Sequence, residues 1–339
     1  MRIAHILILI IVHERITLSS MKILVTGGNG FLGTSLVEKL IKNKHEVAVY
    51  DSTLSFIDRP KYSQAAIKHR KILFPHLPKK YFDADVRDKE ALSHAFEKFN
   101  PEIVVHLAGL PMARPLAQYE SQMIPVNMYG TLNVLEEFEK SPSCKRIVYT
   151  SSSMTYGHFT LNPQPEDVIL NPINSYGATK AAGEYFVKLS KKEWVIVRPT
   201  SVYGYADAAN RVTQLLLDAA LTKKPAWVVQ GETLDLSYIE DVTDGFMLCI
   251  ESPSAMYQTF NISRGEPRAA SDFAEVLKQY FPKFSYEVRE PSVQQVFRGA
   301  LDISKARKFL GYDPKYNIED GIKQILKLVK KHGWVKDAY

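Results

Sequence analysis

Residues 21–40, MKILVTGGNGFLGTSLVEKL, decide the fold, because an apolar run there meets a glycine-rich turn and then a helical pattern. Residues 22–27 have the continuous apolar character of a buried strand. Beyond the turn, apolar residues recur at helical spacing and share one stripe of a predicted helix. The stripe consists of Leu36, Val37, Leu40 and Ile41.

The glycines of this turn follow the spacing G-x-x-G-x-x-G, with Gly27, Gly30 and Gly33 at the three positions. The tight bend needs a residue without Cβ, the next glycine lets a pyrophosphate approach the backbone, and the last lets helix and strand pack closely. The N–H groups at the start of the helix then face the anion. A lone glycine motif can be only a turn, but here a predicted strand precedes it and a predicted helix follows. The stretch therefore predicts a dinucleotide site.

The alternation of strand and helix continues to residue 204. We predict strands at 45–51, 80–88, 102–109, 145–152 and 194–204, and helices at 89–99, 130–140 and 175–192. We expect the polar, proline-interrupted stretch 52–79 to loop over the sheet edge. This order predicts an α/β fold with a Rossmann-type, doubly wound parallel sheet. We expect an NAD-binding domain at 21–200 and a smaller, mixed α/β substrate-binding part at 201–339, some segments of which return to the first domain.

The composition is that of an ordinary globular protein. The 339 residues carry a formal charge of +6, and the lysines are scattered, so we expect no nucleic-acid partner. Cys144 and Cys249 fit neither a disulfide framework nor a metal site, which favours a reducing compartment such as the cytoplasm and predicts no metal. Residues 1–20 contain an apolar run shorter than the roughly 20 residues of a membrane span. We interpret them as a dispensable or mis-called upstream extension; an export signal or membrane role is the alternative.

Two carboxylates end predicted strands next to the glycine turn. Asp51 ends the second strand, where an acidic residue accepts hydrogen bonds from the adenosine ribose and repels a 2′-phosphate, which favours NAD over NADP. The alternative is an ordinary surface turn residue. Asp85 ends the third strand, where a carboxylate can meet the adenine amine.

Tyr176 and Lys180, in SYGATK, share a helix face because they lie four residues apart. An ammonium beside a phenol lowers the tyrosine pKa from about 10. Such a phenol can take or return a hydroxyl proton while hydride moves to a nicotinamide. A chance surface pair is the alternative. The catalytic interpretation of this pair is supported by VYTSSSMTYG. This stretch places serines beyond the carboxyl end of a strand, where open α/β sheets bind ligands.

These residues resemble the extended short-chain dehydrogenase/reductases, and within them the nucleotide-sugar epimerase/dehydratase group, of which UDP-glucose 4-epimerase is a well-known member. The resemblance extends from Met21 to about Leu328. It is carried by TGGNGFLG, DADVRD, VVHLAG, NMYGTLNVLE, TSSSMTYG, SYGATK, VRPTSVYG, YIEDV and ALDISKARKFLGYDP.

The resemblance implies roles for individual residues. Tyr176 is the expected acid/base, Lys180 holds the nicotinamide ribose, and Ser152 is the catalytic serine. Asn127 matches a buried asparagine near the cofactor, although a satisfied core amide is the alternative. Other cofactor contacts implied are Phe31, Leu32, Asp85, Val86, Leu107, Ala108 and Gly109. Substrate contacts expected are Ser152, Ser153, Arg114, Ser201 and Arg289; Arg114 faces a sugar carboxylate or caps a loop.

The residue two after the catalytic serine bears on the reaction. Dehydratases and decarboxylases of the group carry a carboxylate there, whereas this chain has Met154, and a thioether cannot carry a proton. Two departures concern the substrate: Ser201 replaces a common asparagine, and Leu234 replaces an arginine that contacts the substrate diphosphate. Either another cation serves or the substrate lacks the diphosphate. Candidate cations are Arg211, Arg264, Arg268, Arg289 and Arg298.

We therefore expect an NAD-dependent nucleotide-sugar epimerase that acts at C4 through a transient 4-keto sugar, in carbohydrate metabolism or polysaccharide biosynthesis. The resemblance also implies a homodimer that pairs through the helices at 130–140 and 175–186. One alternative is a sugar or alcohol dehydrogenase/reductase of the same family with net turnover of NAD. Another is a non-catalytic NAD-binding protein.

Overall fold

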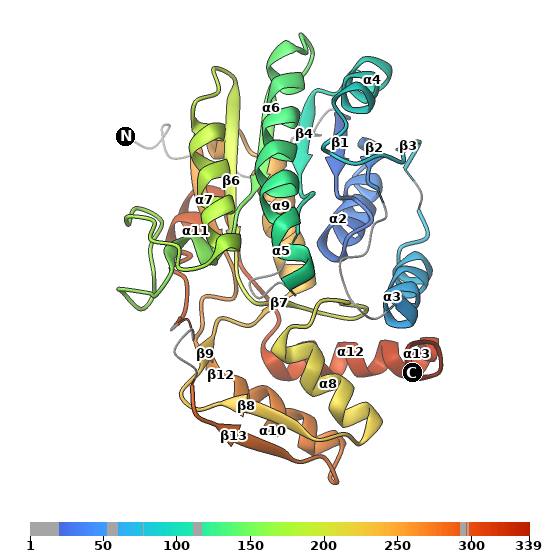
Figure 1. Ribbon diagram of the computed structural model, residues 1–339, viewed down its shortest axis with the longest axis vertical. Helices are drawn as coiled ribbons and strands as arrows, with labels where there is room; N and C mark the ends of the chain where they lie inside the picture. Colours follow the sequence, from blue (N-terminus) through green and yellow to red (C-terminus); the bar gives the residue numbers. More distant parts are fainter. Residues whose placement is uncertain (1–19, 53–59, 77, 111–116, 292–295, 297) are drawn as a thin grey trace, which may run out of the picture.

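A seven-stranded parallel sheet forms the centre of the protein (Figure 1). A computed structural model describes residues 20–52, 60–76, 78–110, 117–291, 296 and 298–339. The extension predicted for residues 1–20 thus lies almost wholly outside the described residues. In spatial order the strands are β11 (Gln258–Ile262), β6 (Glu193–Pro199), β5 (Arg146–Thr150), β4 (Ile103–His106), β1 (Lys22–Thr26), β2 (Glu46–Tyr50) and β3 (Lys80–Phe82). This order confirms the predicted doubly wound fold.

Helices cover both faces of the sheet, because successive strand residues point to opposite sides. Ile23 and Val25 of β1 face a core that includes α2 (Phe31–Lys42), α9 (Ile239–Glu251) and α11 (Ser304–Leu310). Leu24, between them, faces a second core with α4 (Lys89–Phe99), α6 (Gly130–Lys140) and α7 (Ser175–Lys188). Because all strands of this sheet are parallel, their carboxyl ends lie at one edge, where the predicted polar residues also lie.

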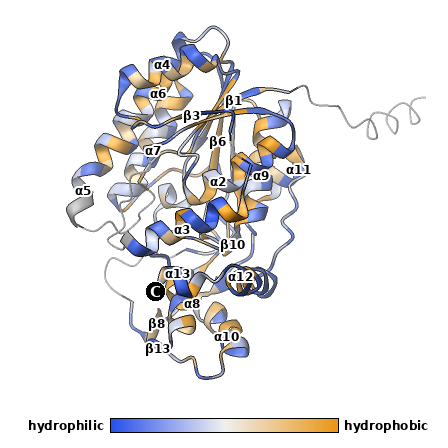
Figure 2. Cartoon of the chain, turned by 90° about the vertical axis from the view of Figure 1, so that its right-hand side faces the viewer, coloured by the Kyte–Doolittle hydropathy of each residue, from blue (hydrophilic) through white to orange (hydrophobic). Residues whose placement is uncertain are grey.

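A third core holds together a smaller body beyond that edge (Figures 1 and 2). Its helices are α8 (Val212–Thr222), α10 (Ala270–Tyr280), α12 (Ile318–His332) and α13 (Trp334–Ala338). Its strands are the pairs β8 (Ala226–Val229) with β13 (Tyr286–Arg289), β9 (Thr233–Leu234) with β12 (Arg268–Ala269), and β7 (Val202–Tyr203) with β10 (Ser237–Tyr238). Between these segments, α9 and β11 return to the large sheet.

The stretch 52–79 is not only a loop, so this expectation was wrong. It contains the helix α3 (Pro60–Leu73), which lies beside α13 (Figures 1 and 2). Tyr62, Ala65 and Ala66 of α3 join the core of the smaller body, and Tyr62 meets the ring of Trp334 edge-on at 5.1 Å between centroids. The partner that stabilises α3 is thus about 270 residues away in sequence, so a local pattern does not reveal it.

Candidate active site

Glycine occupies the three positions of the turn for different structural reasons. Gly27 has φ +73, and a Cβ there would come within 2.6 Å of the amide nitrogen of Ala108. A Cβ at Gly33 would collide with the carbonyl oxygen of Gly27. At Gly30, by contrast, a Cβ would meet only the carbonyl oxygen of Gly27, at 3.1 Å. The fold itself therefore requires Gly27 and Gly33, whereas Gly30 leaves the backbone open toward the neighbouring cavity.

This cavity, of about 300 Å³, begins at the glycine turn and ends at Tyr176 and Lys180. It brings together every predicted cofactor residue except Asn127. They are Gly27, Gly30, Phe31, Leu32, Gly33, Asp51, Asp85, Val86, Leu107, Ala108, Gly109, Tyr176 and Lys180. Sequence reasoning missed other lining residues, notably Arg70 of α3 and the stretch 207–209, while the candidate cation Arg211 also lines the cavity.

The two carboxylates lie at the end of the cavity expected for the nucleoside. Asp51 accepts a hydrogen bond from the backbone N–H of Asn29 at 2.9 Å, which ties it to the glycine turn. Asp85 is held by Arg87, whose Nε and Nη2 donate to its two oxygens at 2.9 and 2.8 Å. These hydrogen bonds lower the pKa of Asp85, so the carboxyl is ionised and serves as an acceptor.

Asn127 lies behind the cavity wall. Its Oδ1 accepts from the N–H of Leu110 at 2.7 Å, and its Nδ2 donates to Met123 Sδ at 3.0 Å and to Thr179 Oγ1 at 3.2 Å. The side chain is 1% exposed. These contacts favour the alternative of a satisfied core amide, which supports the wall at Gly109 and Leu110.

Ser152, Tyr176 and Lys180 meet at the carboxyl edge of the sheet. β5 ends at Thr150 and carries Ser152 just beyond it, while Asn174 caps α7 by accepting from the N–H of Gly177 at 2.8 Å. The Ser152 hydroxyl lies close enough to Tyr176 to lower the pKa of its phenol. Lys180 Nζ donates to the carbonyl oxygen of Thr150 at 2.8 Å. The strand end and the first turns of α7 thus assemble the three side chains.

The electrostatics of this trio differ from the expectation. Burial raises the pKa of Tyr176, and the groups that oppose the increase are the Ser152 hydroxyl and Arg211. Burial lowers the pKa of Lys180 to about 8. The expected lowering of the Tyr176 pKa by Lys180 is therefore not found. The Lys180 ammonium lies against Thr150 and over the ring of Tyr149, at 5.2 Å from its centroid.

The serines on either side of Ser152 have other partners. Ser151 Oγ donates to Glu184 Oε1 at 2.5 Å, and Glu184 in turn forms a buried ion pair with Arg198 at 2.6 Å. Ser153 Oγ donates to Thr200 Oγ1 at 2.8 Å. Ser152 is thus the member of the triplet that faces Tyr176.

The predicted substrate residues are distributed unevenly. Arg114 lies outside the described residues. Arg289 is exposed on β13, paired with Glu287 and stacked over the ring of Trp227 at 5.0 Å from its centroid, so the structure does not bring it to the cavity. Ser201 follows β6 at the carboxyl edge with φ +41, a left-handed conformation in which asparagine is common.

The other candidate cations separate into two groups. Arg264 and Arg268 are bound to acidic residues of the smaller body. Arg211 lines the cavity with Tyr176 and forms an ion pair with Asp207. Arg298 approaches the catalytic end, where its Nη1 lies 3.6 Å from Met154 Sδ. Leu234, at the position of the expected arginine, is 2% exposed in the core of the smaller body.

The residues present fit a dinucleotide. Gly30 leaves room for a phosphate, α2 begins at Phe31 and offers its N–H groups, and carboxylates lie at one end with the tyrosine and lysine at the other. Among the described residues, no group of three or more His, Cys, Asp or Glu side chains is placed to bind a metal ion. No helix of the described part of the chain is long and apolar enough to cross a membrane.

The fold and the site define a dinucleotide-dependent α/β enzyme of the short-chain dehydrogenase/reductase type. The sequence profile of the NAD dependent epimerase/dehydratase family matches residues 23–263. The chain belongs to this family, and its cofactor is NAD. The resemblance, the enzyme class and the cofactor predicted from the sequence are thereby confirmed.

Individual relatives match over nearly their whole length. The UDP-glucose 4-epimerase of Mycolicibacterium smegmatis is 26% identical over 89% of this chain and 96% of the relative. The crystal structure of UDP-glucose 4-epimerase from Thermotoga maritima with UDP-glucose superposes with a TM-score of 0.80 at 26% identity, covering 92% of this chain and 99% of that chain. The Bordetella bronchiseptica enzyme WbmG in complex with NAD and UDP gives a TM-score of 0.80 at 26% identity, covering 93% and 96%.

Proposed function

We propose that the protein is an NAD-dependent nucleotide-sugar epimerase that inverts the configuration at C4. The observation that carries this proposal is the meeting of Ser152, Tyr176 and Lys180 at one end of the dinucleotide cavity. The names of the relatives support it, since UDP-glucose 4-epimerases and a UDP-bound enzyme are among them.

The trio supplies proton transfer and orientation. NAD held in this cavity would supply the hydride acceptor and donor, and its positive charge would favour the Tyr176 phenolate. Tyr176 takes the proton of the sugar 4-hydroxyl as the ketone forms and gives it back when the ketone is reduced. Ser152 holds the phenol and the sugar oxygen in line. Since the hydride returns, there is no net redox change.

The surroundings argue against loss of water from the sugar. Elimination needs a second acid/base near the reacting carbons, and Met154 at that position cannot carry a proton. The neighbouring carboxylate, Glu184, accepts from Ser151 and pairs with Arg198, so its oxygens are occupied. This leaves proton exchange at one hydroxyl, which is what epimerisation, or oxidation with net turnover, requires.

The substrate site lies between the large sheet and the smaller body. Leu234 is in a core, so a substrate diphosphate needs cations other than one at this position. Arg211 and Arg298 are the candidates that lie at the catalytic end, and both come from segments that follow residue 201. We propose that residues after 200 supply the substrate contacts, although the segment 207–211 also lines the cofactor cavity.

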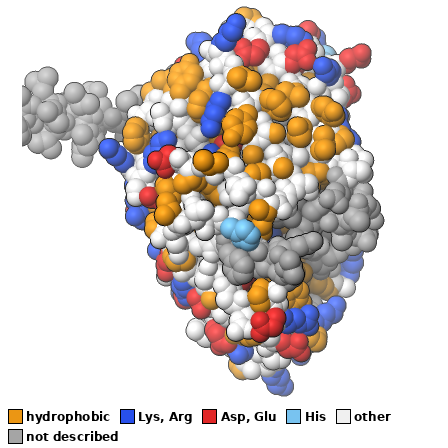
Figure 3. Space-filling model, turned by 60° about the vertical axis from the view of Figure 1, so that its left-hand side comes forward, with side chains coloured by type: hydrophobic (Ala, Val, Ile, Leu, Met, Phe, Trp, Pro, Cys, Tyr) orange, Lys and Arg blue, Asp and Glu red, His pale blue; other side chains and the backbone are white. Residues whose placement is uncertain are grey.

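We also propose a homodimer that pairs through α6 and α7. Tyr129, Leu132, Tyr185 and Leu189 are 58%, 36%, 59% and 80% exposed on this side of the molecule. Hydrophobic side chains gather on the upper part of the face in the space-filling view (Figure 3). An apolar helix pair that faces its own copy buries these side chains in an isologous interface. Sedimentation of the protein and of Leu189→Lys tests this; a wild-type monomer contradicts it.

The catalytic proposal is tested by incubating the enzyme with UDP-glucose, UDP-galactose and the corresponding uronates. We expect interconversion of a 4-epimer pair without accumulation of reduced nicotinamide; steady accumulation supports the dehydrogenase alternative instead. Tyr176→Phe and Ser152→Ala should each lower turnover by about 10²–10⁴-fold. Ser153→Ala is the matched control, because the Ser153 hydroxyl donates its hydrogen bond to Thr200 and not to Tyr176. A Tyr176→Phe variant with unchanged turnover contradicts the proposed mechanism.

A further inference from the structure

The buried guanidinium of Arg70, a residue of α3, lines the dinucleotide cavity. The residue is 8% exposed. Its Nη1 donates to the carbonyl oxygen of Ala206 at 3.2 Å, whereas its Nε has no hydrogen-bond partner among the described residues. A buried donor without a partner costs free energy, so a site that retains one has a reason to do so.

The charge of Arg70 is poorly compensated within the protein. Asp207 and Asp51 attract it, but no described acidic oxygen lies within 4.0 Å of the guanidinium. Asp207 is already engaged, since both its oxygens pair with Arg211 at 2.6 Å. Burial accordingly lowers the pKa of Arg70 to about 10. The Arg70 guanidinium is thus a desolvated cation that can bind an anion.

The position of Arg70 indicates which part of the cofactor it meets. Phe31 begins α2 beside the phosphate-binding turn, and the segment after β7 covers it: Gly204 lies against the Phe31 ring, and Arg211 lies over the ring at 5.8 Å from its centroid. Arg70 is tied to Ala206 of this same segment. Asp51, which also attracts Arg70, marks the adenosine ribose end. A diphosphate bound by the N–H groups at the start of α2 would lie between these two points.

We propose that the Arg70 guanidinium binds the diphosphate of NAD, on the side opposite the glycine turn. The anion then lies between the N–H groups of α2 and a cation, and the second contact comes from a helix inserted between β2 and β3. The unpartnered Nε supplies a charge-assisted hydrogen bond to a phosphate oxygen. The inference concerns cofactor binding alone and does not depend on the identity of the sugar.

The neighbouring residue fixes Arg70 in place. His69 is fully buried, with its Nδ1 2.5 Å from the Tyr205 hydroxyl and its Nε2 2.7 Å from the Asp337 carboxylate. Its ring also meets Trp334 of α13 edge-on at 5.2 Å between centroids. The C-terminal helix thus holds α3 against the cavity. A diphosphate contact that is anchored in this way favours an enzyme that keeps its cofactor between turnovers.

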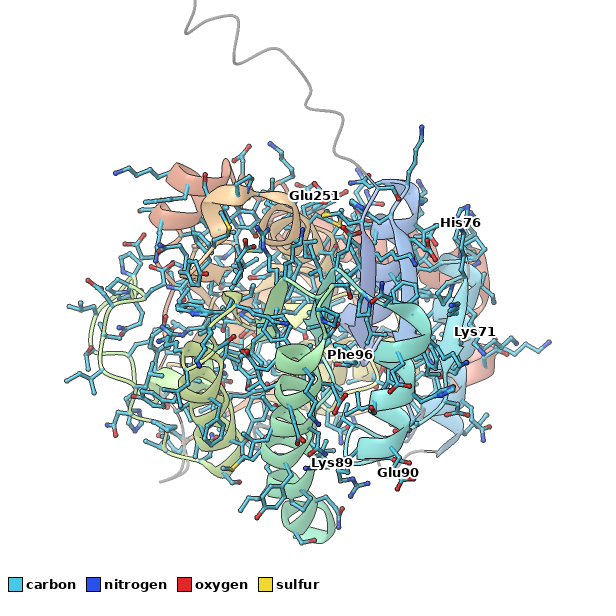
Figure 4. The ribbon with its side chains drawn as sticks, turned by 90° about the horizontal axis from the view of Figure 1, so that it is seen from above. Lys71, His76, Lys89, Glu90, Phe96 and Glu251 are labelled. Carbon is cyan, nitrogen blue, oxygen red and sulfur yellow. The ribbon has the colours of Figure 1, made fainter. Side chains whose placement is uncertain are left out.

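The test compares Arg70→Met, Arg70→Lys and a matched control, Lys71→Met. Lys71 is the next residue of α3 but is exposed at the outer edge of the molecule (Figure 4). For each protein, the bound dinucleotide is quantified after purification. The Kd values of NAD and of adenosine, which lacks the phosphates, are then measured by calorimetric titration at two salt concentrations and without any sugar.

We expect Arg70→Met to raise the Kd of NAD at least about tenfold and to weaken the salt dependence of this Kd. The Kd of adenosine should stay unchanged. Arg70→Lys should fall between Arg70→Met and wild type, and Lys71→Met should match wild type. Unchanged NAD binding in Arg70→Met overturns the proposal, and so does an equal loss for NAD and adenosine. Should Arg70→Met not fold, the same two comparisons are made with Arg70→Lys. A failed sugar assay leaves these outcomes unaffected.

Discussion

Replacing Lys180 by methionine should stabilise the protein at neutral pH, although it removes the proposed catalytic lysine. Lys180 is 4% exposed, and burial lowers its pKa from 10.5 to about 8. At about 1.4 kcal/mol for each pKa unit, the charged lysine costs the folded state about 3 kcal/mol. The hydrogen bond from Nζ to Thr150 offsets about 1 kcal/mol of this. The net gain expected for Lys180→Met at pH 7 is therefore about 2 kcal/mol.

The pH dependence of this gain identifies its cause. Because the pKa of Lys180 is lower in the folded state, the unfolded state binds more protons between pH 8 and 10.5, and wild-type stability rises with pH across this window. Below it both states are protonated and the cost is present in full. Between pH 7 and about 9.5 the cost falls by about 2 kcal/mol, so the advantage of Lys180→Met should nearly vanish.

Urea unfolding at pH 7 and pH 9.5, on proteins with the same dinucleotide content, measures both effects. Lys191→Met is the matched control, since Lys191 is exposed shortly after the end of α7 and its removal should change stability little at either pH. The reasoning is refuted if Lys180→Met is less stable than wild type at pH 7. An advantage of equal size at both pH values refutes it as well, because the gain then does not come from the lysine charge.

Three further substitutions test other features. Gly30→Ala should weaken NAD binding with an unchanged urea midpoint, whereas Gly33→Ala should cost about 1–3 kcal/mol of stability, because only the second Cβ collides with backbone; equal stability losses contradict this. Arg198→Met should cost about 3–5 kcal/mol in urea unfolding, because it leaves the Glu184 carboxylate buried alone, and the double variant with Glu184→Leu should recover most of it. Ser201→Asn should raise stability by up to about 1 kcal/mol, since asparagine tolerates φ +41 better; a lower urea midpoint argues against strain there.

The sequence was sufficient where short-range spacing determines the geometry. The glycine spacing sets the turn between β1 and α2, and the four-residue spacing of Tyr176 and Lys180 sets a shared helix face, so both predictions placed their residues on the same cavity. The end of a strand predicted serines at the site, and the resemblance to the family selected Ser152 among them. In each case the backbone period of one element, or the junction of two neighbouring elements, decides where a side chain lies.

The sequence was insufficient where distant segments meet. Burial raises the pKa of Tyr176 although the Ser152 hydroxyl and Arg211 lower it, and this burial is set by distant segments, so the pattern around Tyr176 predicted the wrong direction. Arg70 lies in a stretch interpreted as a loop, because the helix that carries it is stabilised by α13. Arg289 was expected near the substrate, yet β13 exposes it beside Trp227. Burial and partners of this kind are set by tertiary packing.

Three features that cost stability lie at or beside the dinucleotide cavity. Lys180 is charged and buried, Arg70 has an unpartnered Nε, and Ala206 adopts φ +62 without being glycine or asparagine. The ion pair of Glu184 and Arg198 is equally buried, but Ser151 and Tyr156 complete its hydrogen bonds. Strained or unsatisfied groups persist mainly where function requires them, whereas satisfied ones serve the fold. By this criterion Arg70 belongs with Lys180, as part of the site, and the buried ion pair belongs to the scaffold.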